Sequence, residues 1–193
     1  MFKSRWQVWF GSALIAAGAA ALGWSLWVRN EAAVAQKQAR EWLARAPAIH
    51  PAGAPNAAPA PLRRGDAIGE LDIPRLHLSV MVLEGDDERT LRSGAGHIPG
   101  TALPPVRGNI GIAAHRDTWF RPLRFVKPND RIALKTPAGV SRFTVSDIEI
   151  VPPTDVQALA PAPGRDLTLV TCYPFYYVGP APQRFIVHAK ADS

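Results

Sequence analysis

The N-terminal region contains a long stretch without a charged residue. From Val8 to Val28 the sequence holds only Ala, Gly, Leu, Ile, Val, Trp, Phe and two Ser. About 20 apolar residues are enough to span a bilayer as a helix. Tryptophans stand in pairs at both ends of the stretch, where membrane helices carry interfacial aromatic side chains: Trp6, Trp9, Trp24 and Trp27. The sequence therefore predicts a transmembrane helix over residues 8–28.

Charges on either side of this stretch predict its orientation. Lys3 and Arg5 precede it together with the α-amino group, whereas Arg29 and Glu31 follow it and offset each other. The positive-inside rule then places the N-terminus in the cytoplasm and the rest of the chain on the extracytoplasmic face of the cytoplasmic membrane. A cleaved signal peptide is the alternative, because Ala33–Ala35 has the small-x-small form of a cleavage site. The apolar stretch is long for a signal peptide, which favours an uncleaved single-pass anchor.

Composition divides the chain further. Residues 1–7 form a short cytoplasmic N-terminus, and residues 29–46 are rich in Ala, Gln, Lys, Arg and Glu, which favours a helical stalk. Residues 47–65 contain five prolines among Ala, Gly and Asn, which predicts a semi-extended linker. Residues 66–193 carry the remaining pattern and are predicted to form one folded domain.

The net charge of +6 suggests nucleic-acid binding only until it is divided along the chain. Residues 1–65 hold eight Lys or Arg and two Glu, giving 8 − 2 = +6, whereas the rest holds fourteen of each sign and is neutral. Nucleic-acid binding by the folded domain is therefore not expected. The single cysteine, Cys172, can form neither an internal disulfide nor a zinc site of several thiolates. We expect no metal and no cofactor.

The folded domain has the pattern of an all-β protein. Short β-like segments alternate with Gly, Pro, Asn and Asp, and no long strand–helix–strand alternation is present. Two short helices fit between them, over Asp87–Ser93 with Asp86 as N-cap and over Thr118–Val126 with Asp117 as N-cap. A small closed barrel or sandwich is expected. The candidate strands are 68–73, 79–83, 109–114, 131–135, 140–151, 166–172 and 183–189.

Three residues of catalytic type stand at the ends of candidate strands. His115 follows the segment 109–114, Cys172 ends the segment 166–172, and Arg184 opens the last strand. If the last two strands pair as a hairpin, Cys172 and Arg184 face each other across its mouth. Asn109, Gly111 and Ala113 share one strand face with His115, and this predicts free space beside the imidazole.

These residue types suit acyl transfer. A thiol with an ordinary pKa of about 8.5 is mostly protonated at neutral pH, so a neighbouring cation must favour the thiolate. Histidine can hold the proton and return it to a leaving amine. Arginine stays charged, which suits it to a developing oxyanion and excludes it as a base.

Four segments of the domain resemble the sortase family, and class D within it. They are Gly96–Thr101, Ala114–Asp117, Thr168–Phe175 and Gly179–Val187, and the resemblance extends over about residues 66–190. One departure is Ala114, where Gly or Ser is expected before the histidine. The resemblance implies a closed eight-stranded β-barrel with one or two short helices and a catalytic trio of His115, Cys172 and Arg184.

The same resemblance implies a reaction and its partners. The Cys172 thiolate attacks the carbonyl after Thr in an LPXTG-like sorting signal of an exported protein, and a thioester forms. His115 protonates the leaving amine and then assists an incoming amine, from a cell-wall peptide or a pilin, that resolves the thioester. Arg184 binds the tetrahedral oxygen.

Three further residues in these segments are candidates for substrate binding: Thr171, Tyr173 and His97. Each also has a structural explanation: Thr171 as a strand end, Tyr173 as support for the loop after Cys172, and His97 as a structural histidine. An L,D-transpeptidase is rejected. The motif of that family has Ser-x-Gly directly before the cysteine, whereas Val170-Thr171 precedes Cys172 here. A hydrolytic cysteine peptidase and a tethered, non-catalytic peptide-binding β-domain remain as alternatives.

Overall fold

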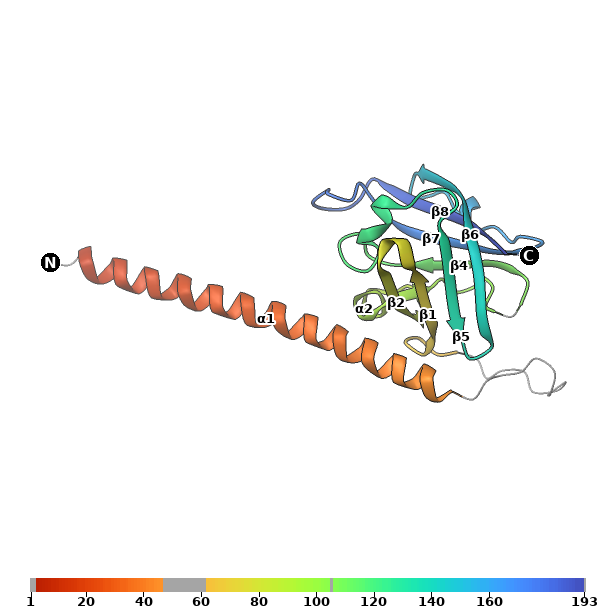
Figure 1. Ribbon diagram of the computed structural model, residues 1–193. Coiled ribbons are helices and arrows are strands. Elements are labelled where there is room, and N and C mark those ends of the chain that lie inside the picture. Colours follow the sequence, from red (N-terminus) through yellow and green to blue (C-terminus); the bar gives the residue numbers. More distant parts are fainter. Residues whose placement is uncertain (1–2, 47–61, 105, 193) are drawn as a thin grey trace.

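The computed structural model describes residues 3–46, 62–104 and 106–192. One long helix, α1 (Lys3–Arg45), leads to a closed β-barrel (Figure 1). The predicted all-β domain is therefore confirmed. α1 runs without a break through the segments predicted as membrane helix and stalk. Most of the predicted linker, residues 47–61, lies outside the described residues.

The barrel has eight strands in the order β1-β2-β3-β4-β7-β8-β6-β5. Neighbouring strands are antiparallel except β2–β3 and β4–β7, which are parallel. β5 pairs back onto β1, so the sheet closes without a free edge. The bounds are β1 Ala67–Ile73, β2 Leu78–Glu84, β3 Ala95–His97, β4 Gly108–Ala113, β5 Arg131–Thr136, β6 Gly139–Val151, β7 Arg165–Tyr173 and β8 Gln183–Ala191.

Seven of these strands lie within two residues of the predicted ones, and β3 was not predicted. The core follows from strand alternation, because inward-facing residues of β1 such as Leu71 and Ile73 are fully buried and pack with Leu134 of β5 and Leu169 of β7. β3 has only three residues, too few to show any period.

The first short helix, α2 (Glu88–Ser93), confirms the predicted position but not the predicted cap. Asp87, rather than Asp86, is the N-cap, and its carboxylate accepts hydrogen bonds from the amides of Arg89 and Thr90. The hydroxyl and amide of Thr90 lower the pKa of Asp87. The cap shifts by one residue because the helix itself begins one residue later than predicted.

The second helix differs more from the prediction. The chain forms a short 3-10 helix, η2 (Arg121–Phe125), preceded by Phe120 without a side-chain cap, so Asp117 does not cap it. Pro122 lacks an amide proton and cannot donate to the carbonyl of Thr118, which an α-helix would require. The Arg121 amide donates to Thr118 instead. Two more 3-10 helices are η1 (Pro74–Leu76) and η3 (Gln157–Leu159).

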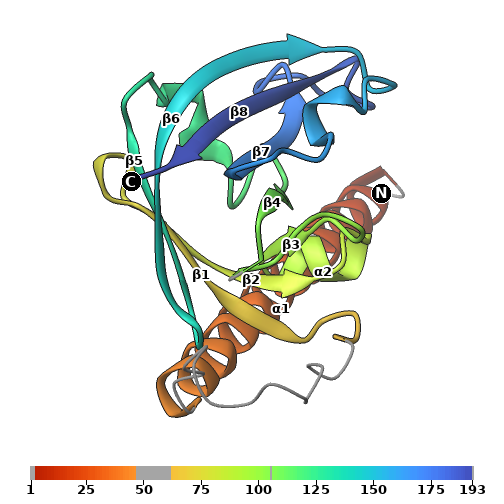
Figure 2. The same ribbon diagram turned by 90° about the vertical axis from the view of Figure 1, so that its right-hand side faces the viewer.

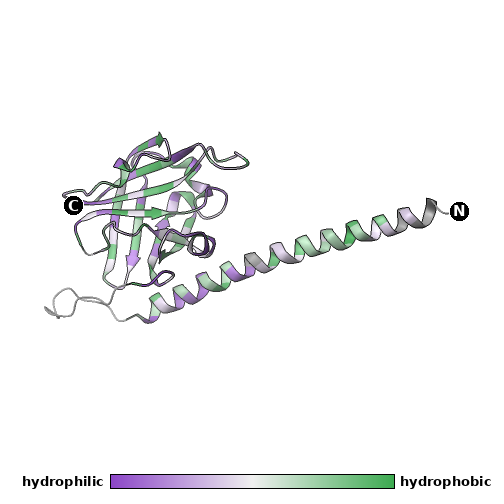
Figure 3. Ribbon diagram, turned by 180° about the vertical axis from the view of Figure 1, so that it is seen from behind, coloured by the Kyte–Doolittle hydropathy of each residue, from purple (hydrophilic) through white to green (hydrophobic). Residues whose placement is uncertain are grey.

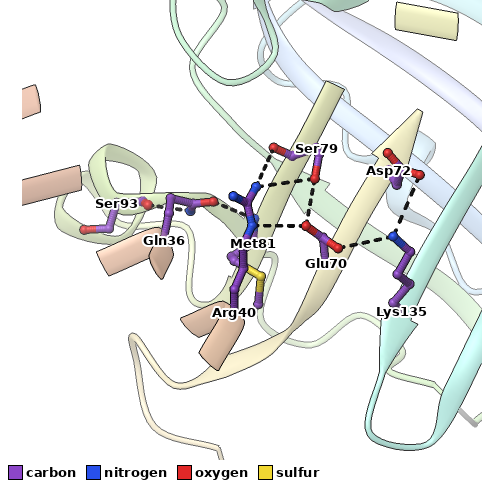
Figure 4. Close-up of polar contacts among 8 residues, drawn as sticks. All are labelled: Gln36, Arg40, Glu70, Asp72, Ser79, Met81, Ser93 and Lys135. Atoms are coloured by element: carbon purple, nitrogen blue, oxygen red, sulfur yellow. Dashed lines mark hydrogen bonds and ion pairs between the residues drawn. The ribbon is translucent and has the colours of Figure 1, made fainter. Parts of the chain in front are cut away.

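The C-terminal part of α1 packs against the side of the barrel formed by β1, β2 and α2 (Figure 2). Gln36 is 5% exposed and forms two hydrogen bonds with opposite roles. Its Nε2 donates to the Ser93 carbonyl at 2.7 Å, and its Oε1 accepts from the Met81 amide at 2.9 Å (Figure 4). Ala39, one turn further along, is buried against Met81 and Leu83.

A set of charged groups borders this contact. The Arg40 Nε atom lies 3.1 Å from Oε1 of Glu70, and Lys135 Nζ lies 3.2 Å from Oε2 of the same carboxylate (Figure 4). Partial burial raises the pKa of Glu70, but hydrogen bonds from Ser79 and Lys135 outweigh it, so the pKa is lowered. The helix is therefore attached to the barrel by the buried hydrogen bonds of Gln36, by the apolar contact of Ala39 and by the more exposed ion pair of Arg40.

The N-terminal part of α1 has an apolar surface with no protein against it. Figure 3 shows hydrophobic residues along this part and hydrophilic ones near the barrel. The helix from Trp9 onward is long and apolar enough to cross a membrane. Its most apolar part is not buried against the rest of the protein. Trp24 and Trp27 are more than half exposed, with ring centroids 5.3 Å apart.

Candidate active site

Cys172 and Arg184 are direct partners in the β7–β8 ladder. This confirms the hairpin expected from the sequence, with both residues at the end of the barrel where the loop 174–182 connects the strands. Cys172 is partly exposed and is a free thiol. Directly opposed residues in an antiparallel pair have their Cβ atoms about 4.5–5.5 Å apart. The thiol and the guanidinium thus share one strand end.

His115 joins them through the parallel pairing of β4 with β7. Ala113 pairs with Val170, and the Ala114 amide donates to the Val170 carbonyl at 3.2 Å. The Thr171 hydroxyl donates to the Ala114 carbonyl at 2.7 Å. Extending this register by two residues brings His115 level with Cys172. Three neighbouring strands, β4, β7 and β8, thereby bring His115, which follows β4, to the same end of the barrel as Cys172 and Arg184.

The histidine faces an acidic side chain. Nε2 of His115 lies 3.6 Å from Oε2 of Glu88, and the two side chains are 31% and 64% exposed. Glu88 opens α2, so the cap by Asp87 also determines where this carboxylate lies. An ion pair forms when the imidazole is protonated, and its exposure limits its contribution to about 1 kcal/mol or less.

Arg184 is held in place by its own loop. Its Nη1 donates to the carbonyls of Gln183 at 3.1 Å and Ala181 at 3.4 Å. These hydrogen bonds restrain the guanidinium at the end of the loop and leave its other nitrogens free of them. A planar cation with several donors is suited to a developing oxyanion.

The small residues on the His115 face of β4 have a different role from the expected one. A Cβ atom at Gly111 would lie 2.9 Å from Leu159 and 3.0 Å from Thr101. Asn109 on the same face is buried and donates to the carbonyls of Ala158 and Ala160. The face is thus filled by η3 and by the segment after β3, and the small residues permit this packing rather than leaving space for the imidazole.

The three candidate substrate-binding residues lie in different surroundings. Thr171 is 2% exposed, and its hydroxyl already donates to Ala114. Tyr173 is partly exposed and stacks on Phe185, with Phe175 completing an aromatic cluster under the loop 174–182. Tyr173 is therefore the one of the three candidates that is partly exposed.

His97 is 2% exposed and lies one strand away from the trio, in β3. Its Nδ1 is 2.8 Å from Oε2 of Glu84, and its Nε2 is 2.9 Å from Oγ1 of Thr101 and 3.1 Å from the Ala102 carbonyl. The Thr101 hydroxyl donates to the Ile98 carbonyl. His97 thus connects β2 to the segment after β3 and is not brought to Cys172.

Sequence reasoning missed a role for Arg116, which directly follows His115. Its Nη2 donates to the carbonyls of Tyr177 at 2.7 Å and Gly179 at 3.0 Å, so the end of β4 holds the β7–β8 loop. The only signal in the sequence was its position beside the candidate base. Among the residues that the structure describes, no group of three or more His, Cys, Asp or Glu side chains is arranged to bind a metal ion.

Comparison with known proteins agrees with this geometry. The family model for the sortase domain matches residues 71–192. Sortase D of Bacillus subtilis (strain 168) is 34% identical over 127 residues, which cover 65% of this chain and 64% of that protein. The chain spans less than two thirds of the length of the curated relatives that it matches.

Solved structures show the same fold. A Clostridium perfringens sortase D5 transpeptidase superposes with a TM-score of 0.67 at 23% identity, covering 83% of this chain and 99% of that one. Sortase A from Corynebacterium diphtheriae gives a TM-score of 0.62 at 27% identity, with 84% of each chain covered. The resemblance to class D is confirmed, and the chain belongs to the sortase family.

Proposed function

We propose that this protein is a membrane-anchored cysteine transpeptidase that cleaves an LPXTG-like sorting signal and transfers the acyl group to an amine. The observation that carries the proposal is the strand pairing: Cys172 opposes Arg184 in the β7–β8 ladder, and β4, which His115 follows, pairs with β7. Family membership supports the same reaction class, because sortases are transpeptidases with a catalytic cysteine.

The reaction has two halves, formation and resolution of a thioester, and Cys172, His115 and Arg184 each have one role in each half. The Cys172 thiolate attacks the scissile carbonyl, and Arg184 donates hydrogen bonds to the oxyanion. As the tetrahedral intermediate collapses, the carbon–nitrogen bond breaks and His115 gives its proton to the leaving amine. An incoming amine then attacks the thioester and loses a proton to His115, which restores the thiolate and the imidazolium. Tyr173, at the edge of the site, is the residue we expect to contact the sorting signal.

The location and partners belong to the same proposal. α1 is long and apolar enough to span a membrane, and Lys3 and Arg5 precede its apolar part. We place its N-terminus in the cytoplasm and the barrel on the extracytoplasmic face. Exported proteins with a C-terminal sorting signal are the acyl donors, and cell-wall peptides or pilins supply the amine.

Intact-protein mass spectrometry tests the reaction. The full chain in detergent micelles is mixed with a panel of LPXTG-like peptides, with and without an added amine. We expect a mass increase that equals the N-terminal peptide fragment, followed by transfer of that fragment to the amine. Cys172→Ala should form no adduct, and Arg184→Ala should form it more slowly by about a hundredfold, as for loss of an oxyanion donor.

Other outcomes separate the alternatives. Release of the fragment to water at the same rate with and without amine would make the protein a hydrolytic peptidase. Peptide binding without any adduct, while a small thiol reagent still labels Cys172, would support a non-catalytic peptide-binding domain and overturn the proposal.

A further inference from the structure

The loop between β7 and β8 carries an exposed apolar tip. Tyr176 is 76% exposed, Tyr177 48% and Val178 96%. From Tyr173 to Gln183 the chain contains no charged residue. An exposed cluster of this kind on a loop is usually a contact surface for another molecule. Arg116 binds the carbonyls of Tyr177 and Gly179, which ties the loop backbone to the segment after β4 while the three side chains stay exposed.

Attachment of α1 fixes the direction in which this loop points. The buried hydrogen bonds of Gln36 and the apolar contact of Ala39 hold the helix against β1, β2 and α2. With the helix in this position, the β7–β8 loop projects from the barrel in the same general direction as the N-terminal half of α1, at some distance from the helix (Figures 1 and 3). That half is the apolar, uncovered part of the helix. A membrane that surrounds it lies on the same side of the barrel as the loop.

The chemistry of the tip fits the boundary of a bilayer. Tyrosine is enriched at membrane interfaces, where its ring contacts acyl chains and its hydroxyl stays hydrated. Two arginines lie directly beneath the tip. The guanidinium carbon of Arg116 is 5.9 Å from the Tyr177 ring centre, and that of Arg124 is 5.4 Å from the Tyr176 ring centre. Both guanidinium groups lie within cation–π distance of the tyrosine rings and so support the tip from the side of the barrel.

We propose that the tip formed by Tyr176, Tyr177 and Val178 is a second membrane contact, seated in the outer lipid interface of the membrane that α1 crosses. This inference rests on the membrane anchor of the proposed function. Together, helix and loop contact the membrane at two points, which leaves the mouth between Cys172 and Arg184 next to the lipid surface. Sorting signals would then be bound close to the point where their own proteins leave the membrane.

Fluorescence quenching tests the contact in the full chain. In Cys172→Ala the native thiol is absent, so Val178→Cys creates a single labelling site at a residue with almost no packing to lose. The protein carries an environment-sensitive fluorophore at this site. It is reconstituted in vesicles of phosphatidylcholine and phosphatidylglycerol, with or without nitroxide-bearing headgroups. We expect the nitroxide lipid to quench more than half of the signal.

Val140→Cys is the matched control. Val140 is also an exposed valine, 49% accessible, and it opens β6 beside the β5–β6 turn, which points away from the N-terminal half of α1 (Figure 1). We expect little quenching there. Equal quenching at both sites would overturn the proposal. A signal at residue 178 that responds to an LPXTG-like peptide and not to lipid would overturn it too, in favour of a peptide contact.

The readout is independent of catalysis. Flotation of the labelled chain with the vesicles verifies the anchor before any quenching is measured, and a chain that does not float overturns both the anchor and the second contact. If wild type forms no acyl adduct while residue 178 is still quenched, the transpeptidase proposal fails and the membrane contact stands. If the adduct forms but residue 178 is not quenched, only the contact fails.

Discussion

One buried hydroxyl connects the two strands that carry the proposed base and nucleophile. Thr171 precedes Cys172, and its Oγ1 donates to the carbonyl of Ala114, the residue before His115. We expect Thr171→Val, which keeps the shape but removes the donor, to cost about 1–3 kcal/mol of unfolding free energy, because a buried carbonyl loses its partner. Since the spacing of His115 and Cys172 changes as well, the rate of acyl-adduct formation should fall about ten- to a hundredfold.

Urea unfolding and adduct kinetics on the full chain in micelles measure the two effects. Thr171→Ser is the matched control, because it retains the hydroxyl while losing a methyl group; it should recover most of the rate. If Thr171→Val and Thr171→Ser slow the reaction equally, the methyl packing matters more than the hydrogen bond, and the positioning role of Thr171 is wrong.

At the scale of elements, one ion pair fastens η1 to the start of β5. The Arg75 guanidinium donates to both carboxylate oxygens of Asp130, whose side chain is 6% exposed, and also to the Phe125 carbonyl at the end of η2. The hydrogen bonds from Arg75 lower the pKa of Asp130, more than burial raises it. The Arg75–Asp130 ion pair therefore connects η1, the end of η2 and the start of β5.

This coupling predicts how stability depends on pH. A carboxyl whose pKa is lower in the folded state contributes stability above its unfolded pKa, about 3.9 for Asp, and loses it as pH falls through the folded pKa. We expect Asp130→Asn to lose about 1–3 kcal/mol at pH 7, from the weakened bonds to Arg75. The difference in unfolding free energy between wild type and Asp130→Asn should become smaller as the solution is acidified below about pH 4.

Urea unfolding of both proteins at several pH values checks this dependence. Asp147→Asn removes the same charge from an exposed site on β6, and it should change stability little at any pH. A gap between wild type and Asp130→Asn that stays constant down to the acid limit would show that the carboxylate charge is not what stabilises the pair.

The comparison of sequence with structure also belongs to this scale. Strands with several alternating or β-branched residues, such as the one ending at Cys172, were predicted within two residues, because their period is local. β3 was missed because three residues carry no period. An α-helix was predicted where the chain forms η2. The composition of the segment favours a helix in general, and it does not show that Pro122 removes one of the hydrogen bonds that an α-helix needs.

The part of the candidate site that comes from neighbouring segments of the sequence could be predicted. Cys172 and Arg184 lie on consecutive strands, so a hairpin was enough to pair them. His115 comes from a strand that joins β7 in parallel, and only the family resemblance related it to the others. The contacts of Glu88 and Arg116 depend on how α2 and the β7–β8 loop pack, which no local pattern records.

At the scale of the whole molecule, the attachment of α1 determines how the barrel sits relative to the apolar helix. The sequence predicted a stalk followed by a linker, and its composition gave no sign that Gln36 would be buried. Without this attachment, only the segment 47–61 would join helix and barrel. When an enzyme is held in one orientation at a membrane, its active site has a high effective concentration toward a substrate in the same membrane. If the enzyme domain rotates freely on its linker, this effective concentration is lower.

Gln36→Leu tests whether this orientation matters. Leucine fills a similar volume but can neither donate to the Ser93 carbonyl nor accept from the Met81 amide. We expect adduct formation with a soluble sorting peptide to stay within about twofold of wild type, because no group of the site changes. With the same peptide anchored to lipid in the same vesicles, the rate should fall by about tenfold, equal to about 1.4 kcal/mol of lost effective concentration.

Gln38→Leu provides the comparison, since Gln38 lies two residues away on α1 and is exposed. It should leave both rates unchanged, which excludes a general effect of added apolar surface. The ratio of the lipid-anchored rate to the soluble rate is the decisive quantity. If Gln36→Leu lowers both rates equally, the two hydrogen bonds stabilise the barrel itself; if it lowers neither, the barrel keeps its orientation without them.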